Sequence, residues 1–238
     1  MADYYTPRKA VIIAGSRVGS TMLCNALDSH PMIGCDRSEP LNPITSPYLK
    51  AGLTNEQTLD IVLNRPGYHV CACKVSYRQI RKQIPLTALI DLGVTKFIHL
   101  WRENPLRVVV SAALNTRSRR EGYTHPTHAW KTPPIQTIAI APETVLMEGT
   151  LYLERVERMK AALQGYDTLT LTYEYIARGT FLYDIPHGEL LGFLQVQHAP
   201  LATHTKQINP HPLSVIVENW SEVCETLQGT ILEKWTAE

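Results

Sequence analysis

A short apolar run followed by a glycine-containing turn opens the chain and limits what it can fold into. Residues 10–13 (AVII) have the composition of a buried β-strand, and residues 14–21 (AGSRVGST) lead directly into a helix-like segment. A strand that turns through glycines into a helix leaves several backbone N–H groups unpaired and directs the positive end of the helix dipole at one point. The turn therefore predicts a site for an anion, most often a phosphate.

This turn differs from the two common nucleotide-binding loops. The Walker A loop, GxxxxGK[ST], has four residues between its glycines and a lysine before the hydroxyl residue. Here three residues separate Gly15 from Gly19, and Ser20 stands in the position of that lysine. A Rossmann fingerprint fits no better, because the turn has no GxG pair. The presence of Arg17 favours a phosphate site without the usual lysine and magnesium over a turn that binds nothing.

Strand-like and helix-like segments alternate along the 238 residues, a pattern typical of a parallel sheet covered by helices. We expect strands at about 9–14, 69–75, 96–101 and 168–173. We expect helices at about 20–29, 54–64, from 105 onward, 145–163 and 213–232. The pattern predicts a single α/β domain over residues 1–238, a length within the range of one domain.

The net charge, the cysteine spacing and the hydropathy argue against a nucleic-acid-binding, disulfide-bonded or membrane-spanning protein. The net charge of +1 gives no overall field for nucleic acid, and the basic cluster at 117–120 is either a solvated helix end or an anion contact. The five cysteines lack CxxC spacing, and Cys71 and Cys73 would share a strand face as buried thiols or as metal ligands. The N-terminal residues are polar, and no apolar run is long enough to span a bilayer. We therefore expect a cytoplasmic protein with reduced thiols.

A proline- and histidine-rich stretch at 122–142 has little helical or strand periodicity. A loop of this length inside a domain is usually functional or else disordered, and we expect a lid over the site at about 119–145. Its candidate substrate-binding residues are His125, His128 and Trp130. Ordinary packing is the alternative for the tryptophan, and a hydrogen-bonded structural role is the alternative for the histidines.

A second anion site is indicated after the strand expected at 96–101. Arg102 follows that strand directly, and Ser111 lies on the helix that comes next. The carboxyl ends of parallel strands meet at one edge of a sheet, where ligands bind. The second site would then form beside the first.

Together these segments resemble the sulfotransferases that use 3′-phosphoadenosine 5′-phosphosulfate (PAPS). In that family a [RK]-x-G-[ST]-[ST] loop between a strand and a helix holds the 5′-phosphosulfate, and residues 17–21 (RVGST) match it. An arginine and a serine after a later strand hold the 3′-phosphate, a tyrosine faces the adenine, and a late segment closes over the nucleotide, here at about 203–213. The resemblance implies that the nucleotide is bound by Arg17, Val18, Gly19, Ser20, Thr21, Arg102, Ser111, Tyr173, Lys206 and Gln207. For the tyrosine, a place in the core is the alternative.

Arg17 and Glu39 are the catalytic residues that the resemblance implies. Residues 30–41 (HPMIGCDRSEPL) are similar to the HP…EP segment of carbohydrate-type and several bacterial sulfotransferases, whose glutamate faces the acceptor. Glu39 would be the general base, and Arg17 would stabilise the bridging oxygen as it leaves. The alternatives for Glu39 are a surface-loop glutamate and another base, either Asp36 or a histidine.

The resemblance implies a P-loop NTPase-like three-layer sandwich with a central, mostly parallel sheet flanked by helices. It also implies metal-free, in-line transfer of a sulfuryl group from PAPS to a hydroxyl group, or a nitrogen, of a small-molecule acceptor. We expect a bacterial enzyme acting on a secondary metabolite or a sugar, with no nucleic-acid or membrane partner, and with a homodimer as one possible assembly. The alternatives are a P-loop nucleotide kinase or other NTPase, and a nucleotide-binding module without catalysis.

Overall fold

The computed structural model describes residues 6–120, 135–177, 186–203 and 210–237. The chain divides into two compact units, each with its own hydrophobic core. The first unit consists of residues 1–101 and 159–204, and the second of residues 102–158 and 205–238. A single domain over residues 1–238 stays a prediction.

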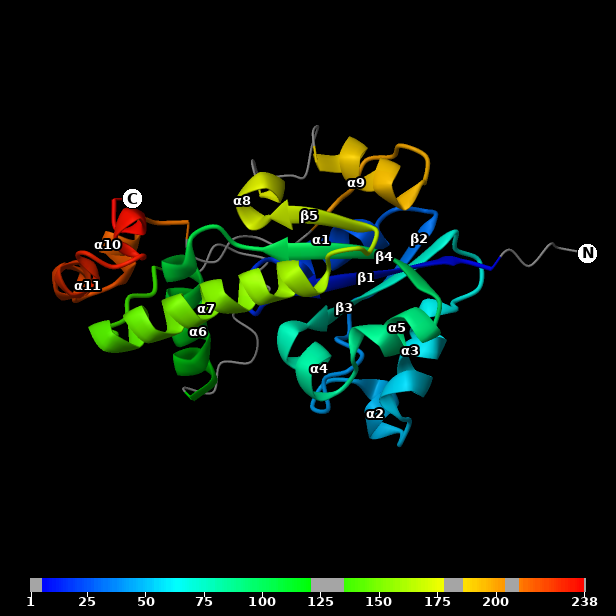
Figure 1. Ribbon diagram of the computed structural model, residues 1–238, viewed down its shortest axis with the longest axis horizontal. Helices are drawn as coiled ribbons and strands as arrows, with labels where there is room; N and C mark the ends of the chain where they lie inside the picture. The colour runs from blue at the N-terminus through cyan, green and yellow to red at the C-terminus, as the bar shows by residue number, and fades with distance from the viewer. Residues whose placement is uncertain (1–5, 121–134, 178–185, 204–209, 238) are drawn as a thin grey trace, which may run out of the picture. The chain divides into compact units, whose positions relative to one another are not determined.

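The first unit is built on a parallel five-stranded sheet in the order β2-β3-β1-β4-β5 (Figure 1). The strands are β1 (Arg8–Ala14), β2 (Ile33–Asp36), β3 (Val70–Ser76), β4 (Val94–Trp101) and β5 (Thr168–Thr172). In the central strand β1, residues 10–14 are all buried. Ala14 pairs with Ser76 on one side and with Leu100 on the other, so β1, β3 and β4 end at the same edge. The predicted parallel sheet is confirmed, with β2 as an additional edge strand.

Helices cover both faces of this sheet, which makes a three-layer α/β arrangement. On one face, Val11 and Ile13 share a core with α3 (Asn55–Leu63) and α5 (Leu86–Asp91), and α4 (Tyr77–Lys82) packs against that core. Figure 1 shows these three helices together on one side of the sheet. The other face meets α1 (Ser20–Asp28), whose Cys24 hydrogen-bonds Cys35 of β2. The remaining helical segments of the unit are α2 (Pro47–Lys50), α8 (Tyr173–Ile176) and α9 (Pro186–Leu194).

Two helices of the first unit begin at reciprocal capping boxes. At α3, the Thr54 hydroxyl accepts a hydrogen bond from the backbone N–H of Gln57, and the Gln57 side chain accepts one from the backbone N–H of Thr54. Ser76 and Gln79 make the same pair of bonds at α4. These bonds satisfy N–H groups that a helix leaves unpaired at its first turn. The helix predicted at 54–64 is confirmed.

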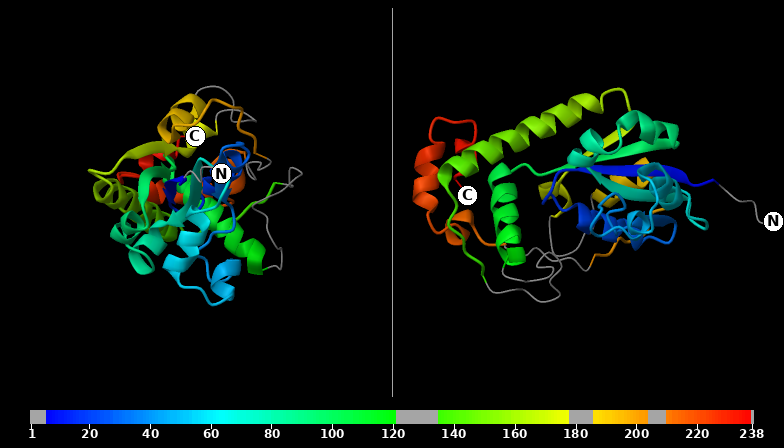
Figure 2. Two further views of the ribbon diagram at one scale, coloured as in Figure 1. Left: turned by 90° about the vertical axis from the view of Figure 1, so that its right-hand side faces the viewer. Right: turned by 90° about the horizontal axis from the view of Figure 1, so that it is seen from below.

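The second unit is helical. It contains α6 (Pro105–Arg120), most of α7 (Pro142–Ala162), α10 (Leu213–Ile216), α11 (Trp220–Leu227) and a short 3₁₀-helix at Glu233–Trp235. Leu106, Val145, Leu213 and Val223 join α6, α7, α10 and α11 in one core. Figure 2 shows α10 and α11 beside the first turns of α7, as this core requires.

The single helix predicted at 213–232 is wrong, because contacts with a distant segment interrupt it. Val217 has extended backbone angles (φ −96°, ψ 112°) and forms an isolated bridge with Ile138. The side chain of Asn219 accepts a hydrogen bond from Ile140 N–H at 3.1 Å and donates one to its carbonyl at 3.0 Å. Residues 217–219 therefore satisfy the backbone of the strand-like segment before α7 instead of continuing the helix. Within the described residues, no helix combines the length and apolar character needed to cross a membrane.

Candidate functional site

The turn between β1 and α1 presents the amino end of a helix at the carboxyl edge of the sheet. Gly19 is the N-cap residue of α1 in the left-handed conformation (φ 83°, ψ 12°), and it has no side chain with which to cap the helix. The first turn of α1 also has no acidic residue, so its N–H groups and dipole face no competing carboxylate from that turn. Arg17 adopts φ 66° and is partly exposed, while the Val18 side chain is fully buried. This geometry suits an anion held by backbone N–H groups.

The Tyr173 ring lies against this turn. A Cβ atom added at Gly19 would lie 2.6 Å from Cδ2 of Tyr173, closer than real Cβ contacts allow. Tyr173 begins α8 directly after β5, where the Thr172 hydroxyl accepts a hydrogen bond from Tyr175 N–H at 3.2 Å. A glycine is therefore required at position 19 both by its positive φ and by the neighbouring ring. The structure places Tyr173 at the predicted nucleotide loop.

A nearly buried lysine connects the turn with Glu39. Nζ of Lys74, on β3, donates to Oγ1 of Thr21 at 2.7 Å and forms an ion pair with Oε1 of Glu39 at 2.7 Å. The Lys74 side chain is 8% exposed, and that of Glu39 is 45% exposed. Glu39 thus lies near the loop, as the resemblance implies.

Sequence reasoning missed Lys74, although the sequence carried a signal. It is the single charged residue in the strand Val70–Ser76, whose other residues up to Val75 are apolar and buried. A cation in such a strand needs a paired partner, because burying an unpaired charge costs several kcal/mol, about the size of a domain's net stability. A lone charge inside a run of buried apolar residues therefore predicts a paired partner nearby.

Glu39 is held in a strained backbone conformation by local hydrogen bonds. Its φ is 55°, and among the described residues only Arg17 and Gln195 are further non-glycine residues with positive φ. The Asn42 side chain donates to Oε2 of Glu39 at 2.8 Å, and Asn42 N–H donates to the Glu39 carbonyl at 2.8 Å. Left-handed non-glycine residues cost about 1–3 kcal/mol and cluster at functional sites. Both residues that the resemblance implies to be catalytic carry this strain.

Among the described residues, Asp36 and one histidine that could serve as the base, His99, are held by contacts of their own. Asp36 is 8% exposed, and its Oδ1 accepts hydrogen bonds from Ser38 N–H at 2.8 Å and Ser38 Oγ at 2.5 Å. The Tyr48 hydroxyl donates to Oδ2 of Asp36 at 3.3 Å, and burial together with this carboxylate raises the pKa of Tyr48. His99 is fully buried against the Tyr77 hydroxyl at 2.7 Å. It pairs with Ile13 and so lies on the opposite sheet face from Lys74, which pairs with Ile12.

The buried cysteines are free thiols, and Cys24 contacts Cys35. The hydrogen bond between Cys35 and Cys24, together with burial, raises the pKa of Cys35 well above its usual range. Burial does the same for Cys73. Cys71 is also buried, and its thiol donates to the Arg65 carbonyl at 3.4 Å. Among the described residues, no cluster of three or more histidine, cysteine or acidic side chains could hold a metal ion, and metal-free catalysis stays a prediction.

The second unit contains the predicted 3′-phosphate residues, Arg102 and Ser111. Arg102 N–H donates to the Tyr152 hydroxyl at 2.7 Å, and that hydroxyl donates to the Arg102 carbonyl at 3.0 Å. Ser111 lies within α6, which begins at Pro105 after Asn104, whose Oδ1 accepts from Arg107 N–H at 3.2 Å. These bonds fix the backbone on both sides of the strand-to-helix turn. Several predicted residues lie outside the described part of the chain: His125, His128, Trp130, Lys206 and Gln207, with most of the lid and the closing segment.

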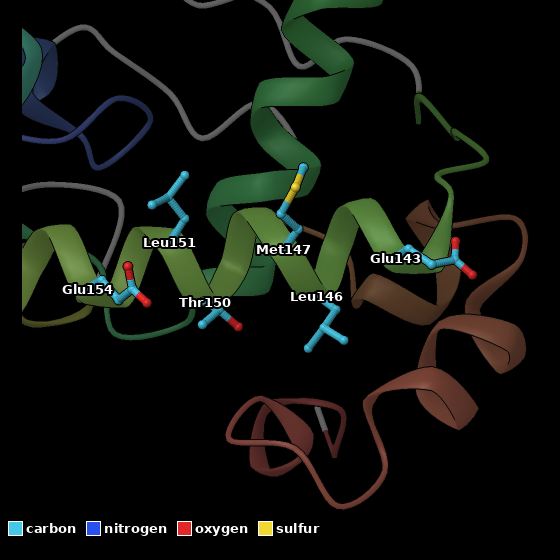
Figure 3. A pocket seen from close by; sticks show the side chains of 6 residues that line it. All are labelled: Glu143, Leu146, Met147, Thr150, Leu151 and Glu154. Atoms are coloured by element: carbon cyan, nitrogen blue, oxygen red, sulfur yellow. The ribbon is translucent and has the colours of Figure 1, made fainter.

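The second unit also has a surface hollow of about 450 Å³ along α7 (Figure 3). All six of its lining residues belong to that helix: Glu143, Leu146, Met147, Thr150, Leu151 and Glu154. None of them is a predicted site residue.

Comparison with solved structures identifies the fold. A sulfotransferase from Alicyclobacillus acidocaldarius superimposes with a TM-score of 0.51 at 15% sequence identity, over 96% of this chain and 98% of that chain. A sulfotransferase domain from the curacin biosynthetic pathway gives a TM-score of 0.46 at 14% identity, over 82% of this chain and 76% of that chain. No protein-family model and no curated protein matches the sequence. The first superposition confirms the predicted P-loop NTPase-like α/β fold.

Proposed function

We propose that the protein transfers a sulfuryl group from PAPS to a hydroxyl group of a small-molecule acceptor, with Glu39 as the general base. One observation carries the proposal: Thr21 Oγ1 and Glu39 Oε1 each lie 2.7 Å from the same Lys74 ammonium group. Thr21 belongs to the loop expected to hold the donor's 5′ end, and Glu39 is the residue expected to take the acceptor's proton. In-line transfer needs these two functions within a few ångströms of one reacting centre.

The described residues suit the donor nucleotide. The N–H groups at residues 18–21 would bind its 5′-phosphate at the amino end of α1, and Tyr173 would contact its adenine. Arg102 and Ser111 would bind the 3′-phosphate, and a guanidinium can do so through paired, charge-assisted hydrogen bonds. PAPS supplies an activated sulfuryl group on its 5′-phosphate.

Glu39 and Arg17 would then divide the chemistry between them. Glu39 accepts the proton of the acceptor hydroxyl while that oxygen forms its bond to sulfur. Arg17 stabilises the negative charge that grows on the bridging oxygen as the bond from sulfur to that oxygen breaks. The products are the sulfate ester of the acceptor, 3′,5′-adenosine bisphosphate and a protonated Glu39. We propose no metal for this reaction.

The acceptor class rests on the segment around Glu39. Residues 30–41 resemble the HP…EP segment of carbohydrate-type and bacterial sulfotransferases, and we therefore propose a sugar or a secondary metabolite. Half-exposure of Glu39 leaves its carboxylate accessible to such a molecule.

Calorimetric titration tests the donor assignment directly. We expect the protein to bind 3′,5′-adenosine bisphosphate without magnesium, and more tightly than ATP with magnesium. Preferential binding of ATP with magnesium would contradict the proposal and favour a P-loop kinase or other NTPase. Incubation with PAPS and a panel of sugars and phenols, followed by mass spectrometry, would then separate a transferase from a non-catalytic nucleotide-binding module.

A further inference from the structure

Lys74 is a nearly buried cation whose two contacts belong to different parts of the site. Its ammonium group meets the Thr21 hydroxyl on α1 and the Glu39 carboxylate in the loop after β2. A buried ion pair contributes little net stability, because desolvation of the two charges offsets their attraction. Its presence among the buried apolar residues 70–75 of β3 therefore points to a role other than packing.

The two carboxylate oxygens of Glu39 have different donors. Oε1 faces Lys74 at 2.7 Å, and Oε2 accepts from the Asn42 side chain at 2.8 Å. Donors on both oxygens restrict rotation of the carboxylate plane, which otherwise rotates broadly about its last torsion. The contact between Lys74 and Thr21 fixes that plane relative to the first turn of α1.

Charge adds to this orientation. An opposite charge close to a carboxylate favours its ionised form, which is the form that accepts a proton. Among the described residues, Lys74 from β3 and Asn42 from the same loop both contact the Glu39 carboxylate. The neighbouring carboxylate, Asp36, is bound to Ser38 and Tyr48.

We propose that Lys74, together with Asn42, is a positioning residue that keeps Glu39 ionised and directs its carboxylate toward the first turn of α1. The inference rests on the proposed function, since a base is the role that needs both an ionised and an oriented carboxylate. Lys74 acts on the reaction through Glu39, and Thr21 anchors it to the donor loop.

The titration of Glu39 tests this role without any substrate. In protein labelled at the glutamate carboxyl carbons, NMR follows each carboxyl with pH, and the resonance lost in Glu39→Gln identifies Glu39. We expect Lys74→Met to move the Glu39 titration up by about one pH unit, since the nearby positive charge is gone. Asn42→Ala should move it less, because Asn42 donates a hydrogen bond but carries no charge.

Lys96→Met is the matched control. Lys96 forms an ion pair with Asp167 at 2.5 Å in the same unit, so its loss removes a similar pair elsewhere. It should leave the Glu39 titration unchanged. If Lys74→Met also leaves that titration unchanged, the proposal is overturned. Should Lys74→Met fail to fold, the wild-type protein still decides the matter: the Glu39 carboxyl must titrate below the ordinary range of a glutamate, and a titration within or above that range overturns the proposal.

Kinetics distinguish this proposal from the proposed function. With an acceptor, the acidic limb of the pH profile of kcat/KM should move to higher pH in Lys74→Met, in step with the NMR titration. If the Glu39 titration moves but the acidic limb of kcat/KM does not, Lys74 is a positioning residue and Glu39 is not the general base. Failure of the wild-type protein to bind 3′,5′-adenosine bisphosphate would refute the donor assignment and leave the titration result standing.

Discussion

The two predicted anion-binding regions are built from different parts of the chain. At the loop before α1, the predicted donors are backbone N–H groups, and Gly19 and Arg17 shape this loop through their left-handed conformations. Around the start of α6, the predicted donors are the side chains of Arg102 and Ser111, and Tyr152 holds the Arg102 backbone. A backbone site depends on the conformation of a few residues, whereas a side-chain site depends on its charge. Substitutions in the first region should therefore act through the loop conformation, and those in the second through loss of a charged donor.

The largest expected effect belongs to Glu39, which serves neither anion-binding region directly. Glu39→Gln should lower kcat by about 10²–10⁴-fold, the usual contribution of a general base, with little loss of affinity for 3′,5′-adenosine bisphosphate. Steady-state kinetics and calorimetry on the same preparation would measure both. Glu56→Gln, on the exposed start of α3, is the matched control and should change neither. Unchanged turnover in Glu39→Gln would place the base elsewhere.

Arg102→Ala tests the side-chain region. It should lower the affinity for 3′,5′-adenosine bisphosphate by about 10–100-fold, which is equivalent to the loss of one hydrogen bond to a charged group. Adenosine 5′-phosphate, which lacks the 3′-phosphate, should lose much less affinity. Arg155→Ala, on the exposed side of α7, provides the control for loss of a surface arginine. Equal losses for the two nucleotides would refute the assignment of Arg102.

Gly19→Ala tests the backbone region, and Gly165→Ala is its matched control. Both glycines have similar positive φ, 83° and 85°, but a Cβ would meet Tyr173 only at Gly19 and open space at Gly165. Each substitution should cost about 1 kcal/mol of unfolding free energy from backbone strain, measured by urea denaturation. Gly19→Ala should lower the unfolding free energy more than Gly165→Ala does. It should also lower the affinity for nucleotides with and without a 3′-phosphate by similar factors. Equal stability losses in the two variants would contradict the close approach of Tyr173.

The smallest expected effect is a difference in the rate of alkylation between a cysteine of the first unit and one of the second. Burial raises the pKa of Cys73 well above its usual range, and it raises the pKa of the partly exposed Cys224 in the second unit less strongly. A raised pKa lowers the thiolate fraction at a given pH, and the thiolate is the form that is alkylated. At pH 8 iodoacetamide should therefore modify Cys224 before Cys73, as followed by mass spectrometry of peptides. Modification of Cys73 first would show that β3 is accessible.

Local patterns in the sequence were sufficient to predict the first strand, its turn and α1. The apolar run, the glycines and the hydroxyl residues lie within a dozen positions, and the structure has them as β1, Gly19 and α1. The four-residue strand β2 has too few side chains for a periodic signal and contains a glycine. It is recognisable as a strand only through its pairing with β3.

Contacts between distant residues explain what could not be predicted. Lys74 contacts Thr21 across 53 positions, and no spacing rule connects a strand lysine with a helix threonine so far away. Asn219 ends the predicted C-terminal helix because it binds Ile140, 79 positions earlier. The left-handed φ of Glu39 has no local signal either, since glutamate rarely adopts it.

The central place of β1 also governs how the chain can fold. Its hydrogen-bonding partners on the two sides, β3 and β4, begin only at Val70 and Val94. During synthesis, the first strand must therefore wait for most of the first hundred residues before its pairing on both edges is complete. Such long-range pairing slows folding relative to a helical bundle of the same size. We accordingly expect a fragment that ends before β4 to leave β1 with an unpaired edge prone to association with other chains.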